Sequence, residues 1–380
     1  MSRTASERTL RVALAAGGTG GHTFPAQALA EALVERGHKA MFITDHRGRI
    51  ANGAIAQQDI HRLSVLSPAG GMVARARSAI SLIRAYGEAR GLLRAVAPDA
   101  VVGFGGYPSA PTVFAASRLG LPLILHEQNA KLGKTNRWMS RQATAVATSF
   151  AGVTEGGSGD IVMTGNPVRR AVVLLRDSTY SQPAVDGPFN LLVIGGSQGA
   201  RSLAEKVPAA LERLDNGLRE RLWVTLQCPR ASLAEAQERL TKAGIAAEVA
   251  EFFDDIAGRI RSSHLVISRS GASSVCEMAV AGRPAIFVPY PHHSDQQQLH
   301  NARALTEAGG GWVMEESELS PKSLADLLSG LAKRPARLSQ AAQAARECGL
   351  PDAADRLADL VERVAGFVPR NGHPIREAAQ

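Results

Sequence analysis

Short apolar runs recur along the chain, separated by glycine-rich turns and by longer segments with helical spacing. Apolar runs bounded by turn formers are typical of strands buried on both faces of a sheet. The clearest unit covers residues 265–288: a strand at 265–267, a small-residue turn at 268–271 and a helix from Ala272 to Ala281 that a glycine ends, followed by a second strand. The pattern predicts an α/β fold built from βαβ units with parallel sheets.

The pattern starts twice. The first series begins with a strand at 12–16 and a glycine turn at 17–22, and the second begins with a strand at 191–194 and a glycine turn at 195–199. Each turn leads into a helical segment, as in the first βα unit of a Rossmann-like domain. Further strands are predicted at 39–44, 100–102, 123–125, 146–148, 161–162, 223–226 and 312–314.

The length and a turn-rich segment in the middle of the chain predict two domains. At 380 residues the chain exceeds one ordinary hydrophobic core. Residues 177–189 are rich in proline and turn formers and are typical of a linker. We therefore predict an N-terminal domain over 1–180 and a C-terminal domain over 181–350, with a helix at about 350–366 that packs back on the N-terminal domain.

The first glycine turn does not fit a dinucleotide-binding site. The GxGxxG pattern requires a third glycine where the chain has Thr23. Asp45, at the end of the second strand, would bind a ribose in such a site and is more often a strand-end turn residue. His22 lies at the mouth of the first helix, where open α/β folds bind ligands. It is either a helix-entry hydrogen bonder or a general base or polar contact for a ligand.

The turn at 268–271 suits an anion. It has little side-chain bulk and opens a helix, whose first N–H groups and positive dipole end favour a phosphate. Glu277, one turn into that helix, repels phosphate but accepts two hydroxyl hydrogens well. The combination indicates a sugar nucleotide, with its pyrophosphate at the turn and its ribose diol on Glu277. The alternative is a solvated glutamate on an ordinary α/β helix.

Polar residues also follow two other predicted strands. The segment 126–129, HEQN, comes directly after the strand at 123–125, and four polar side chains there are costly unless they face a cleft. The strand at 161–162 leads into GNPVR, whose last residue, Arg169, either clamps a phosphate or is a plain surface charge.

The charge of the chain is concentrated in its N-terminal half. The net charge is +8; residues 1–180 hold 21 Lys and Arg against 11 Asp and Glu, and the remainder holds 22 against 24. An anionic partner is therefore expected to bind the N-terminal half.

The three cysteines have no metal-ligand spacing and fit reduced thiols in the cytosol. No DxD-type acidic pair stands where a metal is expected, and no apolar run is long enough to span a membrane.

Residues 72–94 predict an amphipathic helix in which apolar residues alternate with arginines, and Glu88 is its only acid. Arginines beside an apolar stripe suit an anionic membrane surface, where each basic residue contributes about 1 kcal/mol. The alternative is a core-facing helix with solvated arginines. Nucleic acid is not expected, because aromatic residues are nearly absent here. The residues predicted to face the membrane are Arg75, Arg77, Ile80, Ile83 and Arg84.

Seven short motifs occur in order between residues 17 and 298. They are GGTGGH at 17–22, GGY at 105–107, HEQN at 126–129, GNPVR at 165–169, GGSQGA at 195–200, SRSGA at 268–272 and DQQQ at 295–298. Each motif alone is weak, but the set is specific. Through this set the chain resembles the MurG family of peptidoglycan N-acetylglucosaminyltransferases.

The resemblance implies a GT-B fold, in which two Rossmann-like, doubly wound parallel-sheet domains face each other across a cleft. It implies an inverting transfer of GlcNAc from UDP-GlcNAc to the C4 hydroxyl of undecaprenyl-pyrophosphoryl-N-acetylmuramoyl-pentapeptide (lipid I), giving lipid II for peptidoglycan synthesis. Neither a metal nor a cofactor is implied. The implied location is the cytoplasmic face of the inner membrane, as a peripheral protein, with other cell-wall synthesis and division proteins as further candidate partners.

The resemblance also implies roles for single residues. His22 is the leading candidate for the general base and Glu127 is its rival, and the base must come within about 3 Å of the acceptor hydroxyl. Acceptor contacts are expected from Gly18, Gly105, Gly106, Tyr107 and His126. Donor contacts are expected from Thr19, Gly20, Gly21, Asn129, Arg169, Ser197, Gln198, the backbone of Phe253, Ala272, Ser273, Ser274, Val275, Cys276, Glu277 and Gln297.

One departure and two alternatives accompany this resemblance. Cys228 and Pro229 stand where the family has threonine or serine and glycine, beside an expected phosphate or uracil contact. A UDP-GlcNAc 2-epimerase or another UDP-sugar transferase shares the architecture but needs neither the arginine-rich helix nor HEQN. A dinucleotide-binding oxidoreductase or non-enzymatic dinucleotide binder is disfavoured by the failed GxGxxG pattern.

Overall fold

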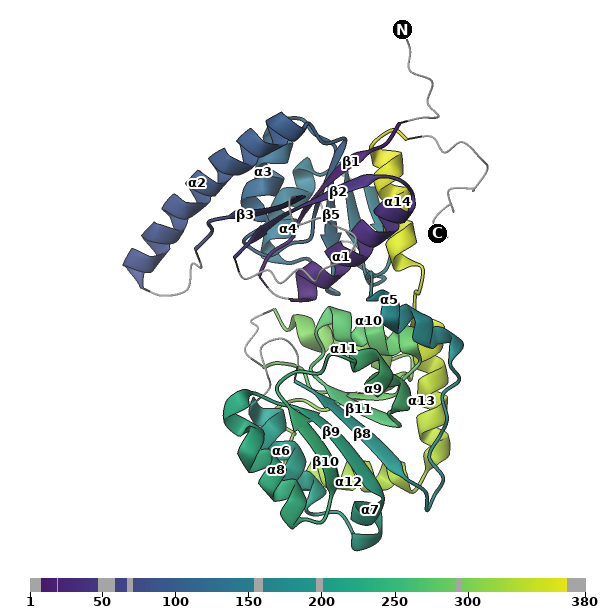
Figure 1. Cartoon of the computed structure of the whole chain (residues 1–380). Coiled ribbons are helices and arrows are strands. Elements are labelled where there is room, and N and C mark those ends of the chain that lie inside the picture. The colour runs from purple at the N-terminus through teal and green to yellow at the C-terminus, as the bar shows by residue number, and fades with distance from the viewer. Residues whose placement is uncertain are drawn as a thin grey trace. The chain divides into compact units, whose positions relative to one another are not determined.

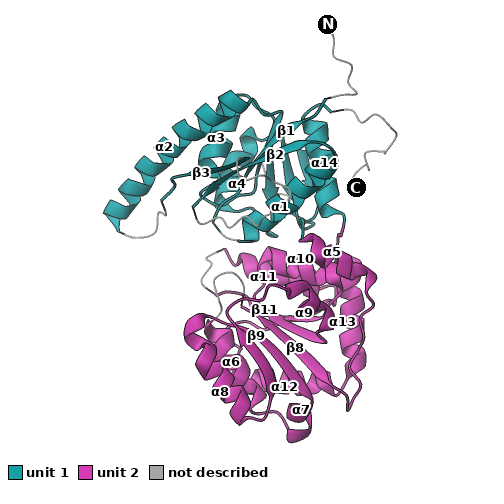
Figure 2. Cartoon of the chain, in the orientation of Figure 1, with its two compact units in different colours: residues 1–168, 352–380 teal, residues 169–351 magenta. Residues whose placement is uncertain are grey.

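A computed structural model describes residues 8–18, 20–46, 59–66, 71–153, 160–195, 201–291 and 295–367. The chain divides into two compact units, shown in different colours in Figure 2. Unit 1 comprises residues 1–168 and 352–380, and unit 2 comprises residues 169–351. Each unit is a parallel sheet with helices on both faces (Figure 1), which confirms the predicted pair of Rossmann-like domains.

The sheet of unit 1 has seven strands in the order β3-β2-β1-β4-β5-β6-β7, all parallel. The order reverses between β1 and β4, so the loops that follow these two strands meet at a topological switch point, where open α/β sheets bind ligands. The strands are β1 (Arg11–Ala15), β2 (Lys39–Asp45), β3 (Ile60–Leu63), β4 (Ala100–Gly103), β5 (Leu123–Glu127), β6 (Ala145–Thr148) and β7 (Asp160–Met163).

Helices cover both faces of this sheet. On one face, α1 and α14 bury leucines such as Leu29 and Leu357 against Leu14 of β1. On the other face, α2 and α3 pack against the alternate residues of the strands. The helices are α1 (Gly20–Glu35), α2 (Met72–Val96), α3 (Ala110–Arg118), α4 (Lys134–Met139), the 3₁₀ turn η2 (Ser140–Gln142) and α14 (Ala353–Val364).

The sheet of unit 2 has six parallel strands in the order β10-β9-β8-β11-β12-β13. Counted from its own first strand, this order matches that of the first six strands of unit 1, so the switch point lies between β8 and β11. The strands are β8 (Phe189–Ile194), β9 (Leu222–Gln227), β10 (Ala246–Ala250), β11 (Leu265–Ser268), β12 (Ala285–Phe287) and β13 (Gly311–Val313).

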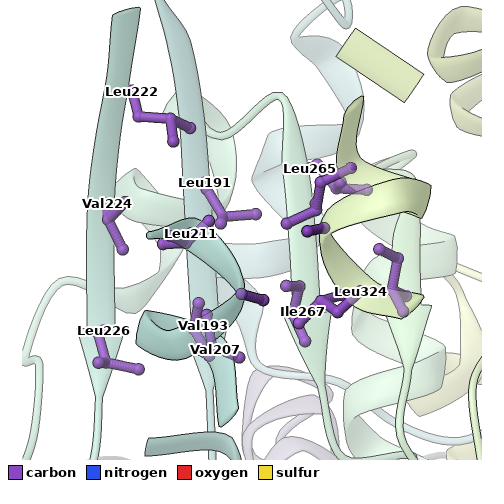
Figure 3. Packing of buried hydrophobic residues seen from close by; sticks show 14 of the residues in the cluster. Leu191, Val193, Val207, Leu211, Leu222, Val224, Leu226, Leu265, Ile267 and Leu324 are labelled. Atoms are coloured by element: carbon purple, nitrogen blue, oxygen red, sulfur yellow. The ribbon is translucent and has the colours of Figure 1, made fainter. Parts of the chain in front are cut away.

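The largest core of unit 2 lies between one face of this sheet and helices α6, α8 and α12. Figure 3 shows Leu191, Val193 and Leu265 of the strands packed against Val207 of α6 and Leu324 of α12. The helices of unit 2 are α5 (Arg170–Val173), η3 (Leu174–Asp177), α6 (Arg201–Leu211), α7 (Asn216–Arg221), η4 (Arg230–Ser232), α8 (Leu233–Lys242), α9 (Ile256–Ser262), α10 (Ala272–Ala281), α11 (Gln297–Thr306), α12 (Pro321–Ala332) and α13 (Pro335–Cys348).

The units divide after Val168, earlier in the chain than the predicted division at 180/181. The reason is that α5 and η3, on the N-terminal side of the expected linker, pack against α10 of unit 2. The returning helix α14 belongs to unit 1. Arg36, after α1, forms ion pairs with Asp359 at 2.6 Å and with Glu362 at 3.2 Å on α14, which fix that helix to α1.

The apolar pattern missed two strands, β3 and β10, each at one edge of its sheet. β3 and β10 are short and carry polar residues such as Arg62 and Glu248. A strand at the edge of a sheet is only half covered, so it lacks the continuous apolar run of a central strand. β5 is longer than predicted and includes His126 and Glu127.

Candidate active site

The two glycine turns at the switch point of unit 1 lie side by side. A Cβ atom placed on Gly17, after β1, would come within 2.4 Å of Cβ of Pro108, after β4. Gly18 has φ of 85°, in the left-handed region, and its N–H donates to Asp45 Oδ1 at 2.9 Å. Asp45 is 1% exposed, and its carboxylate stabilises the glycine turn. It is therefore not placed as the ribose-binding acid of a dinucleotide site.

His22 stands beside the second of these turns. Its Nδ1 lies 2.8 Å from the carbonyl oxygen of Phe104 and 3.0 Å from Gln128 Oε1. Both neighbours are acceptors, so Nδ1 carries the proton and Nε2 is the basic nitrogen. A Cβ on Gly106 would be 3.3 Å from Nε2. Gly105 and Gly106 have φ of 80° and 74°, a backbone that only glycine adopts readily, which brings the turn against the imidazole.

A chain of hydrogen bonds continues from His22 into the sheet. The amide Nε2 of Gln128 donates to His126 Nδ1 at 3.0 Å, and His126 Nε2 donates to the carbonyl oxygen of Gly165 at 3.1 Å. Burial, together with the nearby His22, lowers the pKa of His126 to about 4, although the Gly165 hydrogen bond opposes this. His126 is therefore neutral at pH 7 and orients Gln128, which in turn orients His22.

The expectation that the HEQN side chains face a cleft is wrong for three of the four residues. His126, Glu127 and Gln128 are at most 2% exposed, and only Asn129 is half-buried. Hydrogen bonds within the protein replace those to water, so their burial is tolerated. The side chain of His126 bonds to Gln128 and Gly165, and its contact with the acceptor, which the resemblance implies, stays a prediction.

Glu127 accepts four hydrogen bonds. Its Oε1 accepts from the backbone N–H and the side-chain amide of Asn129, both at 3.0 Å, and its Oε2 accepts from the N–H of Gly133 at 2.8 Å and from Asn136 Nδ2 at 2.9 Å. A carboxylate with two donors on each oxygen has its four lone-pair sites occupied. Glu127 thus holds the loop between β5 and α4. Asn136, which sequence reasoning missed, completes this arrangement.

The start of α10 in unit 2 offers polar groups without partners. Gly271 is the N-cap of the helix and has no side chain. No capping side chain therefore accepts a hydrogen bond from the first N–H groups of the helix. Among the described residues, the hydroxyl oxygens of Ser270 and Ser273 are buried without a hydrogen-bond partner. Asn301 of α11 donates to the carbonyl oxygen of Ser270 at 3.2 Å and holds the turn. These donors are of the kind that bind an anion with several acceptor oxygens.

Glu277 and Arg169 form a bidentate ion pair. Arg169 Nε donates to Glu277 Oε1 at 2.6 Å, and Nη2 donates to Oε2 at 2.7 Å. Burial acts to lower the pKa of the Arg169 guanidinium, but the charge and hydrogen bonds of Glu277 outweigh burial and raise it. The carboxylate oxygens each have a second lone pair for a hydroxyl hydrogen. The sequence singled out both residues but did not indicate that they touch.

Other predicted donor residues differ in what they can offer. The side chain of Val275 is 1% exposed, and its N–H donates to the carbonyl oxygen of Gly271. Neither its side chain nor its N–H is left to bind a ligand. Phe253 is buried with the Arg259 guanidinium 4.0 Å above its ring. Ala272 is buried, whereas Ser274, Cys276 and Gln297 are half-buried and Gly20 and Gly21 lie at the start of α1. Thr19, Ser197 and Gln198 lie outside the described residues.

The departure from the family pattern at Cys228 is explained by the core. Its side chain is 2% exposed and belongs to the hydrophobic cluster of unit 2, and burial raises the pKa of its thiol. The side chain of Cys228 is therefore part of the core. Its N–H donates to the carbonyl oxygen of Ala250 and continues the pairing of β9 with β10.

Helix α2 buries one side against the core of unit 1, where Leu93 is 1% exposed, and leaves other large apolar residues exposed. Ser78, Ser81, Ala85 and Ala89 face the sheet, whereas Ile80 is 53% and Ile83 is 72% exposed. Arg75, Arg77 and Arg84 are also exposed, and the first turns of the helix project beyond the sheet of unit 1 (Figure 1). One side of the helix therefore faces the core, as the alternative predicted, while the exposed isoleucines and arginines lie outside it. In the part of the chain that the structure describes, no helix is long and apolar enough to cross a membrane, and no group of three or more His, Cys, Asp or Glu side chains is placed to hold a metal ion.

Two domain descriptions of one enzyme family match the two sheets. The glycosyltransferase family 28 N-terminal domain matches residues 12–148, and the glycosyltransferase family 28 C-terminal domain matches residues 190–357. The chain belongs to glycosyltransferase family 28. Membership excludes the dinucleotide-binding oxidoreductase that the glycine turns had left open.

Full-length relatives of this family 28 chain carry one name, UDP-N-acetylglucosamine--N-acetylmuramyl-(pentapeptide) pyrophosphoryl-undecaprenol N-acetylglucosamine transferase. The protein of Rhodospirillum centenum is 46% identical over 359 residues, which cover 94% of this chain and 95% of that protein. The protein of Rhodospirillum rubrum is 48% identical over 357 residues, which cover 94% and 92%. The similarity therefore extends over both units.

Solved structures share the fold of this family 28 chain. The crystal structure of Acinetobacter baumannii MurG superposes with a TM-score of 0.73 at 30% identity and covers 94% of this chain and 100% of that one. A complex of S. aureus MnaA with UDP has a TM-score of 0.67 at 13% identity, covering 95% and 98%. At that identity, the second likeness shows the fold alone.

Proposed function

We propose that the chain is an inverting N-acetylglucosaminyltransferase that moves GlcNAc from UDP-GlcNAc to the C4 hydroxyl of undecaprenyl-pyrophosphoryl-N-acetylmuramoyl-pentapeptide, giving lipid II for peptidoglycan synthesis. The observation that carries the proposal is identity of 46% and 48% to transferases of that name over more than nine tenths of each chain. The epimerase alternative has no comparable support, because the likeness to such folds is limited to low identity.

The donor site of the proposal is the start of α10. The pyrophosphate of UDP-GlcNAc accepts hydrogen bonds from the first N–H groups of the helix and from the partnerless hydroxyls of Ser270 and Ser273. The ribose hydroxyls donate to the carboxylate of Glu277, which Arg169 holds with both oxygens aligned. Negative charge grows on the pyrophosphate as the sugar leaves, and the positive end of the helix stabilises it.

The acceptor site of the proposal is the pair of glycine turns beside His22. As the C4 hydroxyl attacks the anomeric carbon, His22 Nε2 takes its proton, and the C1–O bond to UDP breaks with its electron pair on the phosphate. The imidazolium that forms keeps its Nδ1–H on the oxygens of Phe104 and Gln128. Glu127 is the weaker candidate for the base, because four donors already occupy its carboxylate.

The exposed face of α2 supports a further proposal, that unit 1 binds an anionic membrane surface as a peripheral protein on the cytoplasmic face. Ile80 and Ile83 would enter the lipid, and the exposed arginines of the helix would pair with headgroups. Trp138 of α4 is 58% exposed and stacks on Phe114 at 5.7 Å. Tryptophan is typical of membrane interfaces, and sequence reasoning had missed this residue.

The transferase proposal is tested by measuring UDP release from UDP-GlcNAc with and without a lipid I analogue. We expect release that requires the analogue and a disaccharide product. Conversion of UDP-GlcNAc to its C2 epimer without acceptor would establish the epimerase instead. Thermal shift with UDP-GlcNAc and with NAD distinguishes both from a dinucleotide binder, since only UDP-GlcNAc is expected to raise the unfolding temperature.

A further inference from the structure

Arg269 connects the segments that follow four strands of unit 2. It comes directly after β11, and its Nη2 donates to Ser202 Oγ at 2.9 Å, in the first turn of α6, the helix after β8. Its Nη1 donates to the carbonyl oxygens of Val288 and Pro289, after β12, both at 3.2 Å. The same nitrogen donates to Glu316 Oε2, after β13, at 2.5 Å. These four strands are neighbours, and their carboxyl ends form the ligand-binding edge of the sheet.

The pair of Arg269 and Glu316 is charged and mostly buried. The side chain of Arg269 is 11% exposed and that of Glu316 is 19% exposed. Burial acts to raise the pKa of Glu316, but hydrogen bonds from Ser202 and Arg269 and the nearby Lys206 lower it on balance. Lys206 Nζ lies 3.7 Å from Glu316 Oε1. A buried pair with several added hydrogen bonds fixes geometry more reliably than an exposed pair does.

This pair adjoins the turn that opens α10. Ser270 and Gly271 follow Arg269 directly and lead into the helix. The backbone N–H of Arg269 is bonded to the carbonyl oxygen of Ile194 at 3.4 Å, on the neighbouring strand β8. The backbone of Arg269 therefore bonds to β8, and its guanidinium bonds to the segments after β12 and β13. Both sets of bonds hold the turn before α10 in place.

We propose that Arg269 and Glu316 are positioning residues that set the geometry of the nucleotide-diphosphate site at the start of α10. The inference rests on the proposed donor site. The guanidinium of Arg269 donates to protein oxygens of Ser202, Val288, Pro289 and Glu316. The pair therefore acts by placing the turn and not by contacting the nucleotide. N–H groups aimed at a pyrophosphate must be held within about 0.5 Å of the productive geometry.

Lysine cannot replace the arginine in this role. Its ammonium is a single point charge, whereas the planar guanidinium bonds in several directions at once. We expect Arg269→Lys and Glu316→Gln each to raise the Kd for UDP and the KM for UDP-GlcNAc about tenfold, as loss of an outer-shell partner does at other sites. The kcat at saturating donor and the KM for the lipid I analogue are expected to change less than threefold, which is roughly the scatter of such measurements.

The experiment uses the full-length chain, with UDP titrated by calorimetry, initial rates measured against UDP-GlcNAc and the unfolding temperature recorded for each variant. Arg239→Lys is the matched control. Arg239 donates to Glu212 through Nε and Nη2 at 2.7 and 2.9 Å. This is also a bidentate ion pair in unit 2, but it lies at the C-terminal end of α6, whereas Ser202 lies at the N-terminal end. The control is expected to leave the Kd for UDP unchanged.

Each outcome decides between the two claims. A wild-type chain that binds neither UDP nor UDP-GlcNAc overturns the proposed donor site itself. Wild-type binding together with an unchanged Kd in Arg269→Lys and Glu316→Gln overturns the positioning role, whatever the change in unfolding temperature. If Arg269→Lys does not fold, Glu316→Gln, which keeps the shape of the side chain, decides the matter. Ser202→Ala removes only one hydroxyl, and it decides if both others fail to fold.

Discussion

Arg169 donates two parallel hydrogen bonds to Glu277, at 2.6 and 2.7 Å, although 108 residues separate them in the chain. Arg169 is the first residue of unit 2, and Glu277 lies on α10. Bidentate pairs of this kind fix both charge and direction. The carboxylate proposed to hold the ribose is therefore oriented before any nucleotide binds.

Glu277→Gln is expected to raise the KM for UDP-GlcNAc about 10- to 100-fold, with a smaller fall in kcat. A hydrogen bond to a charged group contributes about 1.5–3 kcal/mol, and each 1.4 kcal/mol is tenfold in affinity. The variant keeps the shape of the side chain but removes the charge that pairs with Arg169. Initial rates over a range of donor concentrations measure both constants. Glu212→Gln breaks a similar pair away from α10 and serves as the control; an unaltered KM in Glu277→Gln would contradict the ribose assignment.

His22→Ala is expected to lower kcat by about 10²- to 10⁴-fold, the usual contribution of a general base. The Kd for UDP should change less than about threefold, because the proposed donor site lies in unit 2 and His22 in unit 1. Single-turnover rates and UDP titrations provide the two quantities. His61→Ala, on the edge strand β3, is the control. Equal losses of kcat and UDP affinity would make His22 a binding residue only.

Acid should destabilise the chain through His126. The pKa of this group is about 4 in the folded chain against an ordinary 6.5, chiefly because it is buried. Below pH 6.5 His126 is protonated in the unfolded chain, whereas in the folded chain it stays neutral until the pH falls to about 4. The contribution of His126 to the free energy of unfolding is therefore complete above pH 6.5. It falls by about 3 kcal/mol between pH 6.5 and 4.

His126→Gln removes this proton uptake and should flatten the pH dependence. Urea unfolding at pH 7.5 and at pH 4.5 measures the free energy for both chains, and the difference between the chains cancels the acidic groups that they share. The wild type is expected to lose more stability than the variant between the two pH values. An identical loss would show that the folded chain accepts the proton on His126 without cost.

Loss of the apolar face of α2 should weaken membrane binding. Each isoleucine that enters lipid contributes about 1.5–3 kcal/mol, so the double variant Ile80→Ser and Ile83→Ser is expected to bind vesicles containing anionic lipid at least tenfold more weakly. Co-sedimentation with such vesicles and with neutral ones measures the effect. Ile161→Ser, on edge strand β7, changes an exposed isoleucine elsewhere and is the control. Equal binding by the double variant and the control would contradict the proposed surface.

The sequence was sufficient for the central strands and for most of the residues of interest. Central strands are covered on both faces, so β1, β8 and β11 read as apolar runs, and the glycine turns after them mark the ends of the strands. The start and end of α10 were predicted to the residue, because Gly282 adopts a left-handed conformation that ends the helix. These features depend on a few neighbouring residues and are visible in any window of the chain.

The tertiary structure alone decided which of these residues touch. Pairing of β1 with β2 places Asp45 against the first glycine turn, and pairing of β1 with β4 sets His22 against Gly106. The same long-range pairing joins Arg269 to Glu316. Such contacts depend on strand order and register, to which residues far apart in the chain contribute, so no local pattern contains them.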